Sequence, residues 1–390
     1  MAKLKLAGRL SEVVASVTLA IDAKAKALKS QGADLCNFTV GEPDFETPSH
    51  IREAAKKALD EGKTKYGPAS GDPALKAAVA AKLKNENGLD YSSDNIIITN
   101  GGKQSLFNCI LAMIEKDDEV IIPAPYWLSY PEMVRMAGGR PVVLPTLAAA
   151  RFKITAQQLR AAISPKTKIL ILNSPSNPTG MVYSKKELQE IATVVVEKDI
   201  WVLSDEIYEK LIYEGRQFSI GSLGSEIFSH TIISNGFAKA FSMTGWRVGY
   251  LAGPAELIKA TTKIQSHSTS NVCTFAQAGA LAALSGSQDP IEKMRSAFRE
   301  RRDLACQLFD RVPLLSYQKP DGAFYLFVDI SKTGLKSLEF CERLLEEQKV
   351  ALVPGIAFGD DNHVRISYAT DLSTIKKGVE RIGKFIDNLR

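Results

Sequence analysis

The sequence predicts a mainly parallel α/β sheet of about seven strands with helices on both faces, joined to a smaller α+β domain. Three observations support this fold class. The chain has 390 residues, which favours two domains over one simple core. Its apolar, β-branched runs are continuous rather than alternating, as is typical of strands covered on both faces. Helical patterns separate most of these runs, so we expect neighbouring strands to be parallel.

The large domain is expected over residues 46–288. Helices are predicted over residues 50–61 and 73–87, on either side of a segment rich in glycine and proline. Strands are then predicted at seven apolar runs, which cover residues 95–99, 119–122, 141–144, 168–172, 200–203, 231–234 and 248–251.

The small domain is expected over residues 289–390, and residues 1–45, with a helical stripe that ends near Gly32, are expected to join it. Its pattern changes from alternating strands and helices to a long helix followed by mixed elements. Helices are predicted at 289–312, at 337–347 and at the end of the chain, and strands at 324–328, 350–353 and 363–367.

Composition excludes several classes of protein. The charge is +5, with basic and acidic residues interspersed, and aromatic residues do not interleave with basic clusters, so nucleic-acid binding has little support. The five cysteines are widely spaced and form no Cys-x-x-Cys pair, which indicates neither a disulfide framework nor a metal site. No apolar stretch reaches the roughly 18–20 residues of a membrane span, and the first residues lack a signal-peptide pattern. We therefore expect a cytoplasmic protein.

Residues suited to one ligand follow successive predicted strands. In an open α/β sheet the ligand lies beyond the carboxyl ends of the strands. The segments found there are the glycine turn and helix start at 100–105, Trp127, the turn-rich segment 173–180, Asp205 with Tyr208, and Lys239.

Together these groups suit a phosphorylated pyridine aldehyde. A lysine buried at the mouth of a sheet would have a lowered pKa and could form an imine, although a lone loop lysine is usually solvated. Asp205 would keep a pyridine nitrogen protonated, and Asn177 and Tyr208 could bind a ring phenolate. Trp127 would stack on the ring. The phosphate would lie against Arg247 and the helix start at Gly102, Lys103 and Gln104.

The chain resembles the fold-type I pyridoxal-5'-phosphate enzymes, and among them the class I aminotransferases of the aspartate aminotransferase family, in their bacterial and cyanobacterial branch. The resemblance covers nearly the whole chain. It rests on VGEPDF at 40–45, KY at 65–66, GGKQ at 101–104, PYW at 125–127, NSPSNPTG at 173–180, SDEIY at 204–208, AKAFSMTGWR at 238–247 and VRISY at 364–368.

The resemblance implies a role for each matching residue. It implies pyridoxal 5'-phosphate as the cofactor, an imine on Lys239, and a reaction through aldimine, quinonoid and pyridoxamine-phosphate intermediates. It implies that Arg365 binds the substrate α-carboxylate with help from Asn177 and the backbone of Gly41. It also implies a homodimer with shared sites, in which Tyr66 reaches the phosphate in the other subunit. Ala238 departs from the serine that many relatives have before the lysine.

The substrate expected from the resemblance is aspartate with 2-oxoglutarate. Lys103 matches the lysine that binds the distal carboxylate in the prokaryotic branch, and a cation in the first turn of a helix is otherwise unfavourable. Thr18 resembles a threonine found in relatives that also use prephenate. The alternatives are an aminotransferase for aromatic or other amino acids, a pyridoxal-phosphate lyase on the same scaffold, or a regulatory protein without activity.

Overall fold

A computed structural model describes residues 4–13 and 17–389 of the protein. Its largest element is a seven-stranded sheet with the strand order β2-β8-β7-β6-β5-β3-β4. All pairs are parallel except those of β8, which runs antiparallel to both of its neighbours. The strands are β2 (Ile96–Thr99), β3 (Glu119–Ala124), β4 (Arg140–Pro145), β5 (Thr167–Asn173), β6 (Trp201–Asp205), β7 (Thr231–Gly236) and β8 (Gly249–Ala252).

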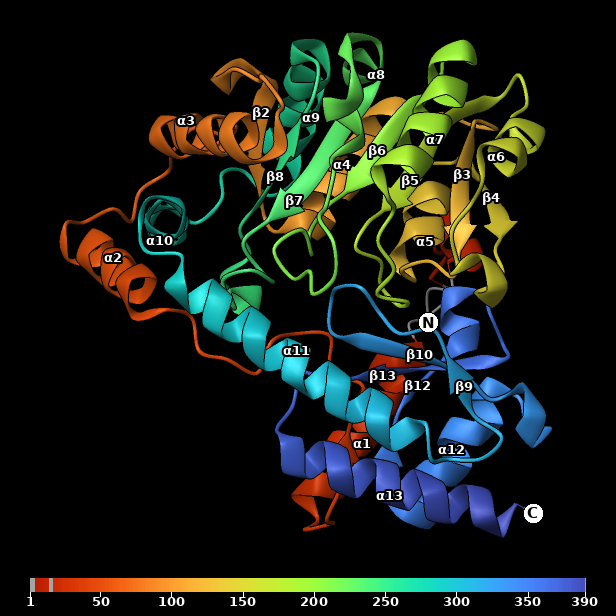
Figure 1. Cartoon of the computed structure of the whole chain (residues 1–390). Helices are drawn as coiled ribbons and strands as arrows, with labels where there is room; N and C mark the ends of the chain where they lie inside the picture. Colours follow the sequence, from red (N-terminus) through yellow and green to blue (C-terminus); the bar gives the residue numbers. More distant parts are fainter. Residues whose placement is uncertain (1–3, 14–16, 390) are drawn as a thin grey trace.

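Helices cover both faces of this sheet (Figure 1). Alternate residues of one strand point to opposite faces. Ile98 of β2 therefore packs in one core cluster with Val79, whereas Ile97 packs in another with Leu106 and Ile110. The helices of this part are α2 (Ser49–Asp60), α3 (Pro73–Lys82), α4 (Gly102–Met113), α5 (Ser129–Met136), α6 (Ala156–Ala162), α7 (Lys185–Glu197), α8 (Ser225–Ser229), α9 (Ala255–Ser268) and α10 (Thr274–Ser285).

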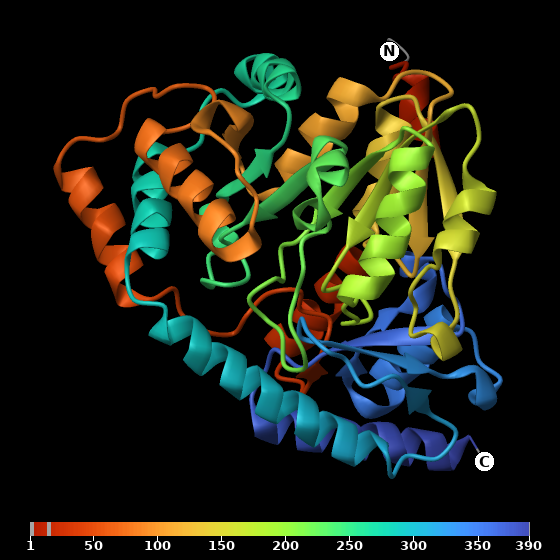
Figure 2. The ribbon, with the colours of Figure 1, turned by 45° about the horizontal axis from the view of Figure 1, so that its top comes forward.

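The C-terminal part is built on a four-stranded antiparallel sheet with the order β12-β13-β10-β9. The long helix α11 runs from the large sheet along this part, as both views show (Figures 1 and 2). The elements are α11 (Asp289–Phe309), β9 (Ser316–Tyr317), β10 (Tyr325–Asp329), α12 (Ser337–Gln348), β11 (Val350–Ala351), β12 (Val353–Pro354), β13 (His363–Ser367) and α13 (Leu372–Asn388).

The N-terminal segment packs on the C-terminal part. After α1 (Val17–Ser30), the short strand β1 (Cys36–Asn37) pairs in parallel with β11. Phe38 belongs to the same core cluster as Phe340 and Phe385 of the C-terminal helices. The assignment of residues 1–45 to the small domain, and the bounds 46–288 and 289–390, stay a prediction.

The predicted fold class is confirmed, and the seven predicted strands are those of the large sheet. Two details differ. The run predicted as one strand over 350–353 is divided between two strands of different sheets, because the chain passes at Leu352 from β11 to β12. The helix predicted over 73–87 ends as an α-helix at Lys82 and continues as a π-helical turn over Leu83–Asn87. None of the described helices is long and apolar enough to cross a membrane.

Candidate active site

The predicted site residues come together because the strand ends that carry them are neighbours. Asn173 pairs with Asp205 across β5 and β6, and Asp205 pairs with Ser234 across β6 and β7. Lys239 follows β7 after a short turn. Parallel pairing therefore places a carboxylate and an amine at the same edge of the sheet.

Lys239 has the environment of a nucleophilic amine. Its Nζ donates a hydrogen bond to the carbonyl of Gly41 and lies 5.8 Å from the ring centroids of both Tyr208 and Phe324. Burial lowers its pKa to about 8, and the positive charge of Arg365 acts in the same direction, while the carboxylate of Glu42 opposes the change. A substantial fraction of the amine is thus neutral near pH 7.

Asp205 is the buried carboxylate of the site. Its Oδ2 accepts a hydrogen bond from the Tyr130 hydroxyl at 2.7 Å, and its Oδ1 accepts one from the backbone of Ile207 at 3.2 Å. Burial raises its pKa to about 6, although these two hydrogen bonds and the charge of Lys239 favour the ionised form. A cation placed against this carboxylate would stabilise its charge, as a protonated pyridine nitrogen would.

Arg365 joins the small sheet to the strand ends of the large one. It lies on β13 with 5% of its surface exposed. Its Nη1 donates to Oδ1 of Asn177 at 3.0 Å and its Nη2 donates to the carbonyl of Thr39 at 2.8 Å. Its Nε has no hydrogen-bond partner among the described residues. A buried guanidinium with an open donor is suited to bind a carboxylate in two parallel hydrogen bonds.

Tyr208 also spans both parts of the molecule. Its hydroxyl lies 2.8 Å from that of Tyr325 on β10, which is buried under the guanidinium of Arg365 at 4.4 Å from the ring centroid. Tyr325 is therefore part of the wall of the candidate site.

The expected phosphate cradle is formed by glycines and an arginine. Arg247 donates to the carbonyls of Thr244 and Asn100 at 2.9 and 3.2 Å. A Cβ at Gly101, which has φ +80°, would lie 2.5 Å from Nη2 of this arginine. A Cβ at Gly249 would lie 2.5 Å from the backbone nitrogen of Gly102, at the start of α4. The absence of side chains at both positions keeps the amides at the helix start accessible to an anion.

The remaining predicted residues lie around this cradle. Gln104 accepts a hydrogen bond from the Asn100 backbone at 2.6 Å and donates to Thr269 at 2.8 Å, so its side chain closes the turn. Lys103 is exposed, with its Nζ 4.9 Å from the ring centroid of Trp127. Partial burial and the charge of Arg247 lower the pKa of Lys103.

Two predicted residues make no described contact with this site. Tyr66 is 91% exposed. Thr18 lies in the first turn of α1, and its side chain is outside the described residues.

Sequence reasoning missed Tyr130 and Glu42. Tyr130 lies three residues after Trp127, where its backbone nitrogen donates to the Trp127 carbonyl at 3.0 Å, and the two rings lie edge to face at 5.3 Å. Its hydrogen bond to Asp205 depends on the pairing of strands far apart in sequence and has no local signal. Glu42 lies inside the VGEPDF motif at 40–45. Its carboxylate raises the pKa of Lys239 only because the loop that carries Gly41 folds over the amine.

The donor set fits a pyridoxal phosphate. The amine, the carboxylate and the glycine cradle provide separate contacts for an aldehyde, a pyridine nitrogen and a phosphate. No group of three or more histidine, cysteine or acidic side chains suited to a metal ion occurs in the described part of the chain. A site with these three contacts at the carboxyl edge of an α/β sheet is that of a fold-type I, pyridoxal-phosphate-dependent enzyme.

Comparison with known proteins narrows this class to one family. The model of aminotransferase class I and II matches residues 33–382, and the chain belongs to this family of pyridoxal-phosphate-dependent enzymes. It is 48% identical to the aspartate aminotransferase of Geobacillus stearothermophilus, over 98% of this chain and 99% of the relative. It is 46% identical to the aspartate/prephenate aminotransferase of Thermus thermophilus, with 98% of each chain covered.

A solved structure also agrees with the fold. Aspartate aminotransferase from Thermus thermophilus with maleate superposes with a TM-score of 0.95 at 46% identity, and the match covers 98% of this chain and all of the other. The expected family and fold type are therefore confirmed.

Proposed function

We propose that the protein is an aspartate aminotransferase, which transfers the amino group of L-aspartate to 2-oxoglutarate and yields oxaloacetate and L-glutamate. The observation that carries this proposal is the pair of cations at the site. Arg365 offers an open donor to an α-carboxylate, and Lys103 lies over Trp127 at the helix start beside the cradle. Two cations suit a dicarboxylic amino acid better than a neutral one.

Bound pyridoxal phosphate supplies the aldehyde for the amino group and a ring that takes up the charge developing at the substrate Cα. Lys239 would carry the aldehyde and, once displaced by substrate, its Nζ would move the proton from Cα. Asp205 would hold the ring nitrogen protonated, with Tyr130 fixing the carboxylate. Asn177 and Tyr208 would orient the ring hydroxyl, and Trp127 would cover the ring face.

The test is kcat/KM for aspartate, alanine and tyrosine, measured for the wild type and Lys103→Ala. We expect aspartate to be the best donor, and the variant to raise KM for aspartate about tenfold more than KM for alanine, because only aspartate has a second carboxylate. Equal effects on both amino acids would refute the role of Lys103. Formation of phenol, pyruvate and ammonia from tyrosine and water, without consumption of 2-oxoglutarate, would indicate a lyase. Prephenate is included as an acceptor, and the contact of Thr18 with it stays a prediction.

We further propose a homodimer in the cytoplasm with sites completed across the interface. The tyrosine ring of Tyr66 is exposed and has no described contact with its own site, and the five cysteines are unpaired. Co-expression of Tyr66→Ala with Lys239→Ala tests the shared site. If Tyr66 acts in the other subunit, the hybrid dimer contains one site with neither defect and regains activity. If it acts in its own subunit, no activity returns.

A further inference from the structure

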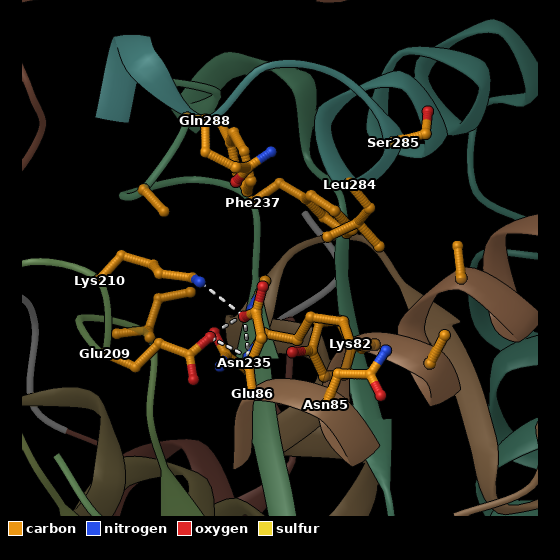
Figure 3. A pocket seen from close by; sticks show the side chains of 17 residues that line it. Lys82, Asn85, Glu86, Glu209, Lys210, Asn235, Phe237, Leu284, Ser285 and Gln288 are labelled. Atoms are coloured by element: carbon orange, nitrogen blue, oxygen red, sulfur yellow. Dashed lines mark hydrogen bonds and ion pairs between the residues drawn. The ribbon is translucent and has the colours of Figure 1, made fainter. Parts of the chain in front are cut away.

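A cluster of charged side chains lies behind the turn that carries Asp205 and Tyr208, with Lys82 and Glu209 largely buried and Glu86 and Lys210 more exposed. It lines a pocket of about 240 Å³ between α3, the turn after β7 and the start of α11 (Figure 3). Its charged members are Lys82, Glu86, Glu209 and Lys210. None of them belongs to the site described above.

Glu209 is the centre of this cluster. Its side chain is 11% exposed, and it accepts hydrogen bonds from Lys82 and from Nδ2 of Asn87, the latter at 2.7 Å. Lys82 in turn donates to Oδ1 of Asn87 at 2.8 Å, which closes a three-membered ring of hydrogen bonds. Burial raises the pKa of Glu209, but the charge of Lys82 and these hydrogen bonds outweigh burial and leave the pKa below its usual value.

A second ion pair fixes the same two segments. Lys210 Nζ lies 2.6 Å from the carboxylate of Glu86. Glu86 and Asn87 both lie in the π-helical turn Leu83–Asn87, which ends at Gly88 with φ 70°. A π-turn changes the direction of side chains relative to a regular helix and occurs often near functional sites. Here it allows residues of one turn to face both Glu209 and Lys210.

Hydrogen bonds also hold other residues of the turn at 205–209 in place. Glu206 accepts hydrogen bonds from the hydroxyls of Ser204 and Ser219 at 2.9 and 2.6 Å, and its backbone nitrogen donates to Ser234 at 3.0 Å. Asp205 and Tyr208 instead contact Tyr130 and Tyr325. The turn thus has Asp205 and Tyr208 in contact with residues of the site, and Glu209 in contact with the cluster.

A buried ion pair adds little net stability, because desolvation offsets most of the attraction. Its geometry, however, is well defined. We propose that Lys82, Asn87 and Glu209 are positioning residues, which hold the turn at residues 205–209 so that Asp205 and Tyr208 meet the cofactor ring. This inference rests on the proposed function only in that the enzyme binds pyridoxal phosphate.

The test compares Lys82→Met with Lys84→Met. Lys84 is the matched control, because it lies on the same segment and pairs with Asp90 where both side chains are exposed. The readouts are the dissociation constant of pyridoxal phosphate and the visible absorption and circular dichroism of the bound cofactor, recorded well below the unfolding temperature. We expect Lys82→Met to weaken cofactor binding about tenfold and to alter the visible spectra. This is the lower end of the loss of affinity seen when a residue that supports a ligand-binding residue is removed.

Lys84→Met should leave both readouts unchanged, and Lys82→Arg should restore them in part. Asn87→Ala, which removes one donor from a half-buried position, provides a milder variant in case Lys82→Met does not fold. Ethylammonium chloride should restore part of the cofactor affinity of Lys82→Ala, since the pocket beside the missing side chain admits a small cation. Sodium chloride should leave the affinity of this variant unchanged. Wild-type spectra and affinity in both Lys82→Met and Asn87→Ala would overturn the proposal. None of these readouts needs an amino-acid substrate, so they are independent of whether aspartate is the donor.

Discussion

Raising the pH should increase the rate at which Lys239 of the cofactor-free enzyme captures pyridoxal phosphate, and the increase should end near pH 8. The pKa of this amine is lowered from 10.5 to about 8, mainly by burial. At pH 7 about one amine in ten is then neutral, against about one in three thousand at the ordinary value. The protein thereby raises the concentration of the nucleophile roughly 300-fold at this pH.

The sign follows from the chemistry of the amine. Only the neutral form attacks an aldehyde, so the rate should rise about tenfold per pH unit below the pKa and level off above it. Glu42 opposes the lowering of the pKa, so Glu42→Gln should move the midpoint to lower pH. Its carboxylate also accepts a hydrogen bond from Thr244 at 2.6 Å, and Thr244→Val, which removes that bond but keeps the charge, separates the two effects.

The assay is stopped-flow absorbance after mixing the cofactor-free enzyme with pyridoxal phosphate between about pH 6 and 10. Reduction with borohydride followed by peptide mass spectrometry identifies the lysine that carries the product, and Lys239→Ala provides the blank. A rate that continues to rise tenfold per unit beyond pH 9 would refute the argument that burial activates this amine.

Three further predictions follow from the geometry. Arg365→Gln should raise KM for aspartate about 10- to 100-fold, as expected for the loss of charge-assisted hydrogen bonds, with a smaller change in cofactor affinity; an unchanged KM would exclude the arginine from substrate binding. Asp205→Asn should lower kcat about a hundredfold, because a neutral amide cannot stabilise a protonated ring nitrogen, and steady-state kinetics should show little change in KM. Gly249→Ala should destabilise the protein by about 1–3 kcal/mol in denaturant unfolding, since its Cβ would lie 2.5 Å from the Gly102 nitrogen. Gly245→Ala, where no neighbouring atom lies within 4 Å, is its control and should unfold like the wild type.

Much of the fold could be predicted because its signals are local. Continuous apolar runs such as those of β2 and β6 are typical of strands that are buried on both faces. The rule that ligands lie at the carboxyl ends of parallel strands then selected Asp205 and Lys239 without knowledge of the strand order. The division of Val350–Pro354 between two sheets was not predictable, because it depends on pairing partners outside the segment. β11 pairs with β1, which lies more than 300 residues earlier in the chain, whereas β12 pairs with β13.

By itself, the sequence determined the class of fold and the cofactor chemistry. It also pointed to Lys239, Asp205 and Arg365 as the proposed amine, carboxylate and arginine of the site, since each follows a recognisable strand or motif. Only the tertiary structure decided how those groups are tuned and supported. The lowered pKa of Lys239, the hydrogen bond from Tyr130 to Asp205 and the cluster of Lys82, Asn87 and Glu209 all require burial or contacts between distant segments. Burial and long-range contacts arise from packing, and no local stretch of sequence encodes them alone.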